Sequence, residues 1–188
     1  MNPRFSLNYH KLTSDPRFTK LANAMAMHSV IDSPSSFNGY CRDACSAWKA
    51  NVDAPAFPVS PLHGKRLAEI EAGGPAVIQT TWGGVAITRH EHPHIEKYLV
   101  IRKGGYLALE KHELKDERLT VVEGAGLLLY QTATHHPLTV QALTPGDEFH
   151  FLPGIVHCII GTEDLLVFER STDPKGMDQD LIFLYEPN

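Results

Sequence analysis

The sequence predicts an all-β sandwich or barrel preceded by a helical N-terminal segment, and two observations lead to this prediction. From residue 76 onward, short runs rich in β-forming residues alternate with turn residues, and Gly or Pro separates many of the runs. No helical pattern lies between them, whereas a parallel α/β sheet would need one. The 188 residues, 43% of them hydrophobic, fit one domain, or one domain with an added end. We therefore divide the chain into an extension, residues 1–75, and a barrel, residues 76–188.

Helices are expected in the extension over residues 16–28, 37–51 and 62–72. The first has Ser14 and Asp15 as capping residues and Pro16 at its first position, where the missing N–H is not needed. The third is followed by Gly73 and Gly74, which end helices readily. The extension is expected to pack on the barrel or to build a homodimer.

Strands are expected in the barrel over residues 76–82, 85–89, 97–102, 106–112, 119–122, 127–130, 138–143, 148–152, 156–160, 165–169 and 181–185. The sequence contains no internal repeat and no low-complexity tract. This number of short strands is typical of a closed or two-layered β structure.

Composition excludes several classes of partner. The formal net charge is −5, from 17 basic and 22 acidic residues, which is unlike the basic surplus of a nucleic-acid-binding protein. No apolar run approaches the ~20 residues of a membrane span, and residues 1–15 hold no apolar signal-peptide core. The three cysteines, Cys41, Cys45 and Cys158, are few and odd in number, so a reduced cytoplasmic setting is expected.

Histidine is the enriched residue type. The chain has 11 histidines, and eight of them lie between His90 and His157. Two segments in this region place possible metal ligands beside glycines: Gly84-x5-His90-x-His92-x3-Glu96, and Gly104-x5-Glu110-x-His112-x4-Glu117-x6-Gly124. Further along, Pro153-Gly154 precedes His157.

The spacing of these residues has a physical meaning. Residues i and i+2 of a strand point to the same face of the sheet, so two ligands at that spacing can share one ion. A carboxylate from the next strand and a histidine from a distant strand complete a mixed nitrogen and oxygen set. Such a set suits a divalent cation such as Zn, Fe, Mn or Ni and leaves room for water or substrate.

Over residues 82–186 the sequence resembles a cupin, a double-stranded β-helix or jelly-roll-like barrel with two ligand motifs. The resemblance implies that Glu110, His112 and Glu117 come from the first motif and His157 from the second. The 21 residues between Gly124 and Gly146 suit one hairpin.

The alternative first motif is His90, His92 and Glu96, with His94 beside them. We favour the Glu110 set, because the alternative leaves 41 residues before Gly146 and an unused motif-like segment among them. In the favoured interpretation, His90, His92 and His94 lie in a turn near the barrel mouth.

A narrower resemblance is to the cupin domains of mannose-6-phosphate isomerases. It rests on Trp82-Gly83, Lys97, Leu107-Ala-Leu-Glu-Lys-His112, Glu117 and Val121-Val-Glu-Gly124, and on a tail with Glu169-Arg170-Ser171-Thr172, Asp178 and Asp180. In that group a Gln often holds the first ligand position, so a residue other than His at position 110 is compatible with it.

Further residues are candidates for substrate contacts. Lys97 lies on a strand leading to the site and can steady an anionic intermediate, or it can be a solvated strand lysine. Tyr106 shares the strand parity of Glu110 and is expected to face the interior. Tyr130, His150 and Arg170 are expected to line the pocket, with packing or exposure as the alternative for each.

The predicted function is metal-dependent aldose–ketose isomerisation of a sugar or sugar phosphate. The cation would stabilise an enediolate, and Glu117 or another inward carboxylate would carry the proton. Two alternatives stay open: an Fe(II)-dependent cupin dioxygenase, and a non-catalytic cupin that binds a sugar or another small molecule.

Overall fold

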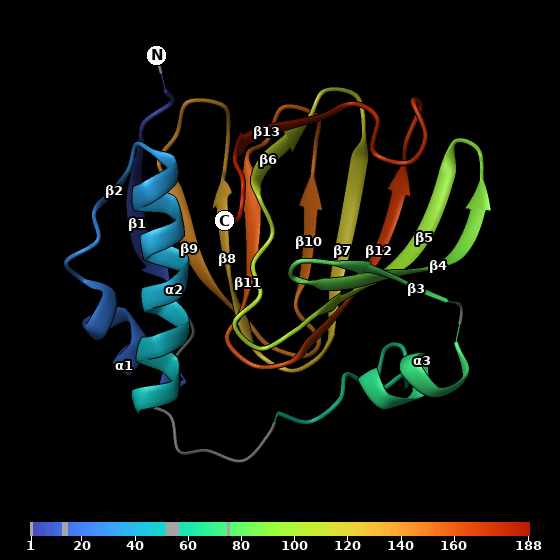
Figure 1. Ribbon diagram of the computed structural model, residues 1–188, viewed down its shortest axis with the longest axis horizontal. Coiled ribbons are helices and arrows are strands. Elements are labelled where there is room, and N and C mark those ends of the chain that lie inside the picture. Colours follow the sequence, from blue (N-terminus) through green and yellow to red (C-terminus); the bar gives the residue numbers. More distant parts are fainter. Residues whose placement is uncertain (1, 13–14, 52–56, 75) are drawn as a thin grey trace.

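The structure, a computed structural model, describes residues 2–12, 15–51, 57–74 and 76–188. Figure 1 shows two β-sheets that face each other, with helices against the outside of one sheet. The strands are β1 (Phe5–Lys11), β2 (Val30–Ile31), β3 (Val77–Thr80), β4 (Gly83–Glu91), β5 (His94–Ile101), β6 (Leu109–His112), β7 (Asp116–Glu123), β8 (Gly126–Gln131), β9 (Leu138–Leu143), β10 (Glu148–Phe151), β11 (His157–Gly161), β12 (Leu165–Thr172) and β13 (Leu181–Tyr185). The helices are α1 (Pro16–Met25), α2 (Pro34–Asn51) and α3 (Leu67–Gly73).

The strand order shows how the chain winds. One sheet has the order β13-β6-β11-β8-β9-β1-β2, and the other has the order β10-β7-β12-β5-β4-β3. Strands β6, β8, β9, β11 and β13 join the first sheet, while β7, β10 and β12 join the second. The chain therefore crosses repeatedly between the sheets, which is the winding of a double-stranded β-helix.

Each of the eleven expected strands overlaps an observed strand, from β3 to β13. The N-terminal 75 residues differ from the expectation, because they are not purely helical. Strand β1 pairs in parallel with β9 and antiparallel with β2, so this segment extends the seven-stranded sheet. Ser14 lies outside the described residues, whereas Asp15 caps α1 by accepting a hydrogen bond from the Arg17 amide at 2.9 Å.

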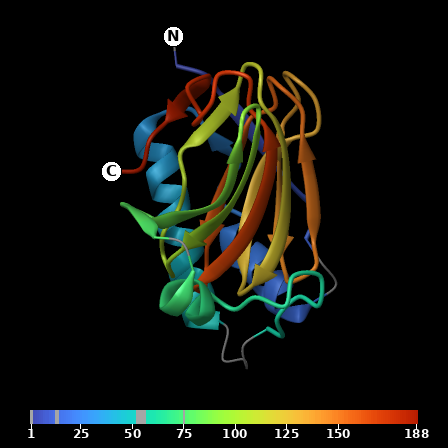
Figure 2. The same cartoon turned by 90° about the vertical axis from the view of Figure 1, so that its right-hand side faces the viewer.

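The helices cover the outer faces of the sheets. Phe18 of α1 and Trp48 of α2 are completely buried, with ring centroids 4.8 Å apart, in one cluster with Leu127 and Leu129 of β8. Helix α3 instead packs through its Leu67 and Ile70 against the outside of the six-stranded sheet. Figure 2 turns the molecule so that this sheet faces the viewer and α3 lies at its lower end.

The space between the sheets is apolar at one end and ionisable at the other. Leu99, Leu119, Ile159 and Val167 point inward and form the interior cluster. Two residues away on each strand, the inward position is ionisable: Lys97 on β5, Glu117 on β7, His157 on β11 and Glu169 on β12. Since inward positions repeat every two residues, one end of the barrel collects these four side chains.

Gly124, the last residue of the second ligand segment, has a backbone conformation that requires glycine. Gly124 has φ +88°, and a Cβ there would lie 1.9 Å from the carbonyl oxygen of Asp164. No L side chain fits this turn. The glycine therefore allows the tight turn between β7 and β8. Glu117 on β7 lies in the six-stranded sheet, and after the turn the chain crosses to the seven-stranded sheet.

Candidate functional site

A cavity of about 420 Å³ opens at the ionisable end of the barrel. Its lining combines aromatic, aliphatic and charged side chains from both sheets. The ionisable lining residues are Lys97, Glu110, His112, Lys115, Glu117, His157, Glu169, Asp178 and Glu186. A cavity of this size with convergent polar groups is typical of a small-molecule site.

Two imidazoles converge on one carboxylate in this cavity. The Nε2 atom of His157 lies 3.4 Å from Oε2 of Glu117, and Nε2 of His112 lies 3.9 Å from the same oxygen. The two rings are stacked with centroids 6.2 Å apart, and all three side chains are at most 5% exposed. The structure thus brings together three of the four residues of the favoured ligand set.

The opposite nitrogen of each imidazole is held by an acceptor. Nδ1 of His112 donates to Oδ1 of Asp180 at 2.9 Å, and Nδ1 of His157 donates to the carbonyl of Ile155 at 3.2 Å. Asp180 is fixed in turn, because its Oδ2 accepts the amides of Leu114 and Lys115. In its neutral form each ring therefore carries the proton on Nδ1 and directs the Nε2 lone pair toward Glu117.

The Glu117 carboxylate is under-satisfied. Its Oε2 is buried and has no hydrogen-bond partner among the described residues. A buried carboxylate oxygen without a partner is costly, and two imidazole lone pairs beside it are not donors. A cation between the three atoms removes this cost.

The donor set fits a divalent cation. Ligand atoms held about 2.1 Å from such an ion lie about 3.0–3.4 Å from one another, close to the observed separations of 3.4 and 3.9 Å. As arranged here, no group of three or more His, Cys, Asp or Glu side chains in the described ranges could hold a metal ion. His112 would have to approach Glu117 by about 0.5 Å for its Nε2 to lie within the separations that a bound ion requires.

A paired network of two lysines and two acids lies beside this set. Nζ of Lys115 lies 2.6 Å from Glu169 and 2.8 Å from Asp178, and Nζ of Lys97 lies 3.2 and 2.6 Å from the same two acids. Ser171 also donates to Glu169. Burial raises the pKa of Asp178, but the two ammonium groups outweigh it and hold that pKa well below its ordinary value.

Burial controls the ionisation of the remaining groups. It lowers the pKa of His157 to about 4, so this imidazole is neutral, as a metal ligand must be. Burial also raises the pKa of Glu117 to about 7, although Lys115 opposes it. Burial and the neighbouring Glu117 raise the pKa of Glu110 to about 8.

Glu110 lies apart from the three converging residues. It lines the same cavity, but its carboxyl forms no hydrogen bond or ion pair with any described residue. In particular, it is not within ion-pair distance of His112 or His157, although it stands opposite His157 in the register of β6 and β11. The structure thus places a free carboxyl group beside the candidate metal ligands rather than among them.

The prediction that Tyr106 faces the barrel interior is wrong. Its hydroxyl donates to Oδ1 of Asn38 on α2 at 2.7 Å, and its ring packs edge-on against Phe37. The expected strand begins only at Leu109, so the alternation of Glu110 and His112 does not extend back to Tyr106. Tyr130 does not line the cavity either, because its hydroxyl donates to Gln141 and its ring packs near Phe149 and Phe151.

His150 and Arg170 are also corrected, since both lie on the outer face of the six-stranded sheet. His150 contacts Asp116 at 2.9 Å, and Arg170 donates to Glu96 at 3.1 Å. Arg170 follows the inward-pointing Glu169 directly, so it points outward. Neither residue lines the cavity.

The alternative ligand set does not assemble. His90 stands opposite Ile95 in the β4–β5 hairpin, and Ile95 is on the face of the sheet opposite to Glu96. His90 and Glu96 therefore point to opposite faces, while His92 lies in the turn between the strands. His90, His92 and His94 are all exposed.

Lys115 and Asp180 belong to the site but are not among the site residues expected from the sequence. Lys115 lies two residues before Glu117. If the expected strand is extended toward its N-terminus, this spacing predicts that Lys115 and Glu117 point to the same face of the sheet. Asp180 acts through residues that are distant in sequence, and its role follows only from the pairing of β13 with β6. Lys97, in contrast, was predicted and does line the cavity.

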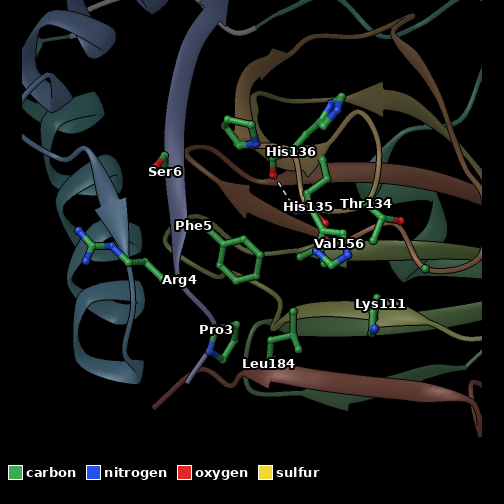
Figure 3. A pocket seen from close by; sticks show the side chains of 13 residues that line it. Pro3, Arg4, Phe5, Ser6, Lys111, Thr134, His135, His136, Val156 and Leu184 are labelled. Carbon is green, nitrogen blue, oxygen red and sulfur yellow. Dashed lines mark hydrogen bonds between the residues drawn. The ribbon is translucent and has the colours of Figure 1, made fainter. Parts of the chain in front are cut away.

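A second pocket, of about 450 Å³, lies between the N-terminal residues and the loop that carries His135 and His136 (Figure 3). Lys111 points into it from the outer face of β6. None of the converging ligands lines this pocket, so it is separate from the candidate metal site.

The placement of Tyr106 leads to a testable prediction. Tyr106→Phe removes one hydrogen bond to Asn38, which still accepts the amide of Asn188. The free energy of unfolding is expected to fall by about 1 kcal/mol, as measured by urea denaturation. Any activity of the folded protein is expected to remain, and a large loss of activity without a loss of stability would contradict this placement.

Comparisons with solved structures bear on the fold. No family model and no curated protein matches the chain. The capsular polysaccharide assembling protein CapF from Staphylococcus aureus superposes with a TM-score of 0.51 at 13% identity, over 90% of this chain and 46% of its own. The chain thus spans about half the length of CapF.

Weaker likenesses extend to shorter proteins. KdgF from Halomonas sp. is 23% identical over 50% of this chain and 81% of its own, with a TM-score of 0.43. An uncharacterised Klebsiella pneumoniae protein with a double-stranded β-helix domain is 15% identical over 64% of this chain and 96% of its own, with a TM-score of 0.44. The winding of the chain and its likeness to CapF give the fold, which is a double-stranded β-helix. Within the described ranges, none of the helices has the length and hydropathy needed to cross a bilayer.

Proposed function

We propose that the protein is a metal-dependent aldose–ketose isomerase that acts on a sugar or sugar phosphate. One observation carries the proposal: a partnerless carboxyl group, that of Glu110, lies in the same cavity as His112, Glu117 and His157. Isomerisation needs both a cation site for two neighbouring substrate oxygens and a separate group that moves a proton between their carbons.

The residues divide between these two tasks. His112, His157 and Glu117 would hold the cation, which supplies Lewis-acid polarisation of the substrate oxygens when bound. Asp180 fixes the tautomer and the orientation of His112. Glu110 takes the proton from the carbon next to the aldose carbonyl and returns it to the former carbonyl carbon, while the hydroxyl proton on the first carbon passes to the former carbonyl oxygen.

Lys97 supports the charge that develops in the substrate. It uses two of its three ammonium protons on Glu169 and Asp178, which leaves one for an enediolate oxygen. The resemblance to the cupin domains of mannose-6-phosphate isomerases supports the same reaction type.

The test uses the purified protein loaded separately with Zn²⁺, Mn²⁺, Fe²⁺ or Ni²⁺. Each form is incubated with a panel of aldoses and phosphosugars in D₂O, and products are followed by proton NMR. Ketose formation with deuterium at the carbon next to the carbonyl is expected. The absence of turnover with every metal and every sugar contradicts the proposal.

A second candidate function follows from the same ligands. Two histidines and one carboxylate, with Glu110 outside the set, also match the facial triad of non-haem Fe(II) oxygenases. Oxygen consumption by the Fe(II)-loaded protein, in the presence of an organic substrate and without isomerisation, would favour this function.

Asp180→Asn tests the ligand assignment without changing a ligand. The amide no longer accepts strongly from His112 Nδ1, so Zn²⁺ affinity is expected to fall about 10–100-fold. Affinity is measured by competition with a chelator. Asp116→Asn is the matched control, because Asp116 contacts His150 at the same 2.9 Å on the outer face. Equal affinities of the two variants would contradict the assignment.

A further inference from the structure

We propose that the substrate is an uncharged, unphosphorylated sugar or polyol. This inference rests on the proposed function for the location of the site and narrows its substrate class. It is carried by the charge and hydrogen-bonding state of the described residues that line the cavity.

The cavity lining carries more acids than bases. Its acidic side chains are Glu110, Glu117, Glu169, Asp178 and Glu186, and its basic side chains are Lys97 and Lys115, with no arginine among them. A divalent cation on the two histidines and Glu117 brings the total close to zero but creates no surplus of positive charge for a phosphate group.

The two lysines are already neutralised. Each Nζ lies within 3.2 Å of both Glu169 and Asp178, and these contacts fix the lysines on the cavity wall. Lys115 has a third acid, Glu117, at 3.9 Å. The one ammonium proton that Lys97 has left can meet a single phosphate oxygen, and any further pairing of the phosphate would displace a buried carboxylate from a lysine and leave that carboxylate unpaired.

The unused hydrogen-bonding capacity favours hydroxyl groups. Glu110 has no described partner, and Glu186 lies exposed at the cavity lining. An ionised carboxylate such as that of Glu186 only accepts hydrogen bonds, so it matches the donor hydroxyls of a sugar and repels the acceptor oxygens of a phosphate. Trp82 and Phe183 supply apolar surface for the C–H groups of a sugar ring or chain.

Binding is tested with a pair of probes that cannot be isomerised. The Zn²⁺-loaded protein is titrated calorimetrically with D-mannitol and with D-mannitol 1-phosphate. Mannitol is expected to bind, and the phosphate ester at least about 100-fold more weakly. Equal or tighter binding of the ester overturns the inference, and so does failure of both probes to bind.

Kinetics separate this inference from the proposed function. Each aldose is assayed beside its terminal phosphate ester. A higher kcat/KM for the esters overturns the inference and leaves the isomerase function intact. Binding of mannitol without turnover of any aldose contradicts the isomerase function and leaves the inference intact.

Two variants test the cause of the preference. Asp178→Asn removes one acid from both lysines, and Glu186→Gln removes a charge without touching the lysine network. Both are expected to strengthen binding of the phosphate ester several-fold relative to mannitol. Asp164→Asn, on an exposed residue away from the cavity, is the control. If Glu186→Gln folds normally and neither variant exceeds this control, the charge argument is wrong.

Discussion

Replacing Glu110 with glutamine is expected to lower kcat by about 10²–10⁴-fold, because the amide cannot carry a proton between two substrate carbons. Its carboxyl has no partner among the described residues, so the isosteric amide breaks no interaction that holds the barrel together. KM and metal content are expected to change little. Steady-state kinetics of the metal-loaded variant, together with elemental analysis, measure all three quantities.

Glu113→Gln is the matched control. Glu113 is three residues along the chain and exposed, so its substitution is expected to leave kcat unchanged. If Glu110→Gln instead loses the metal, Glu110 is a fourth ligand, and the proton must be carried by another group. An unchanged kcat with the metal retained would remove Glu110 from the mechanism.

Replacing Lys115 with methionine is expected to lower the free energy of unfolding by about 3–5 kcal/mol. The lysine side chain is only 2% exposed and contacts Glu169 and Asp178 at 2.6 and 2.8 Å. Methionine fills a similar volume but leaves Glu169 buried with only Lys97 as a cationic partner. Urea denaturation of the metal-free protein measures the change.

Lys111→Met is the control, since Lys111 is only partly buried and points away from the barrel interior. It is expected to change the free energy of unfolding by less than about 0.5 kcal/mol. The double variant Lys115→Met with Glu169→Met is expected to recover part of the loss, because a buried pair can be replaced by apolar side chains at little cost. If Lys115→Met behaves like Lys111→Met, the lysine network does not stabilise the fold.

The strands of the barrel could be predicted from the sequence because short β-rich runs and turn glycines mark them locally. Strand β1 is not among the expected strands, although Phe5, Leu7 and Tyr9 alternate with polar residues, because the N-terminal run is short and polar overall. The pairing of β1 with β9 spans most of the chain and has no local signal.

The candidate site was predictable where it depends on strand parity and not where it depends on loops. His112 and Glu117 were predicted from their spacing together with the resemblance to the cupin motifs. Arg170 was misplaced although its position next to Glu169 places it on the opposite face. Tyr106 was misplaced because the chain before Leu109 is not a regular strand. Asp180 depends on the long-range pairing of β13 with β6, which spacing does not reveal.

The acids Asp178 and Asp180 lie on the segment between β12 and β13, near the end of the chain, and this has a consequence for the order of folding. Until that segment docks, Lys97 and Lys115 share only Glu169 at close range, and His112 lacks its acceptor. In a chain synthesised only as far as Thr172, the two lysines therefore share one close acid inside an open barrel. Docking of β13 onto β6 brings Asp178 to both lysines and orients the first imidazole in one event, so closure of the barrel and maturation of the site coincide.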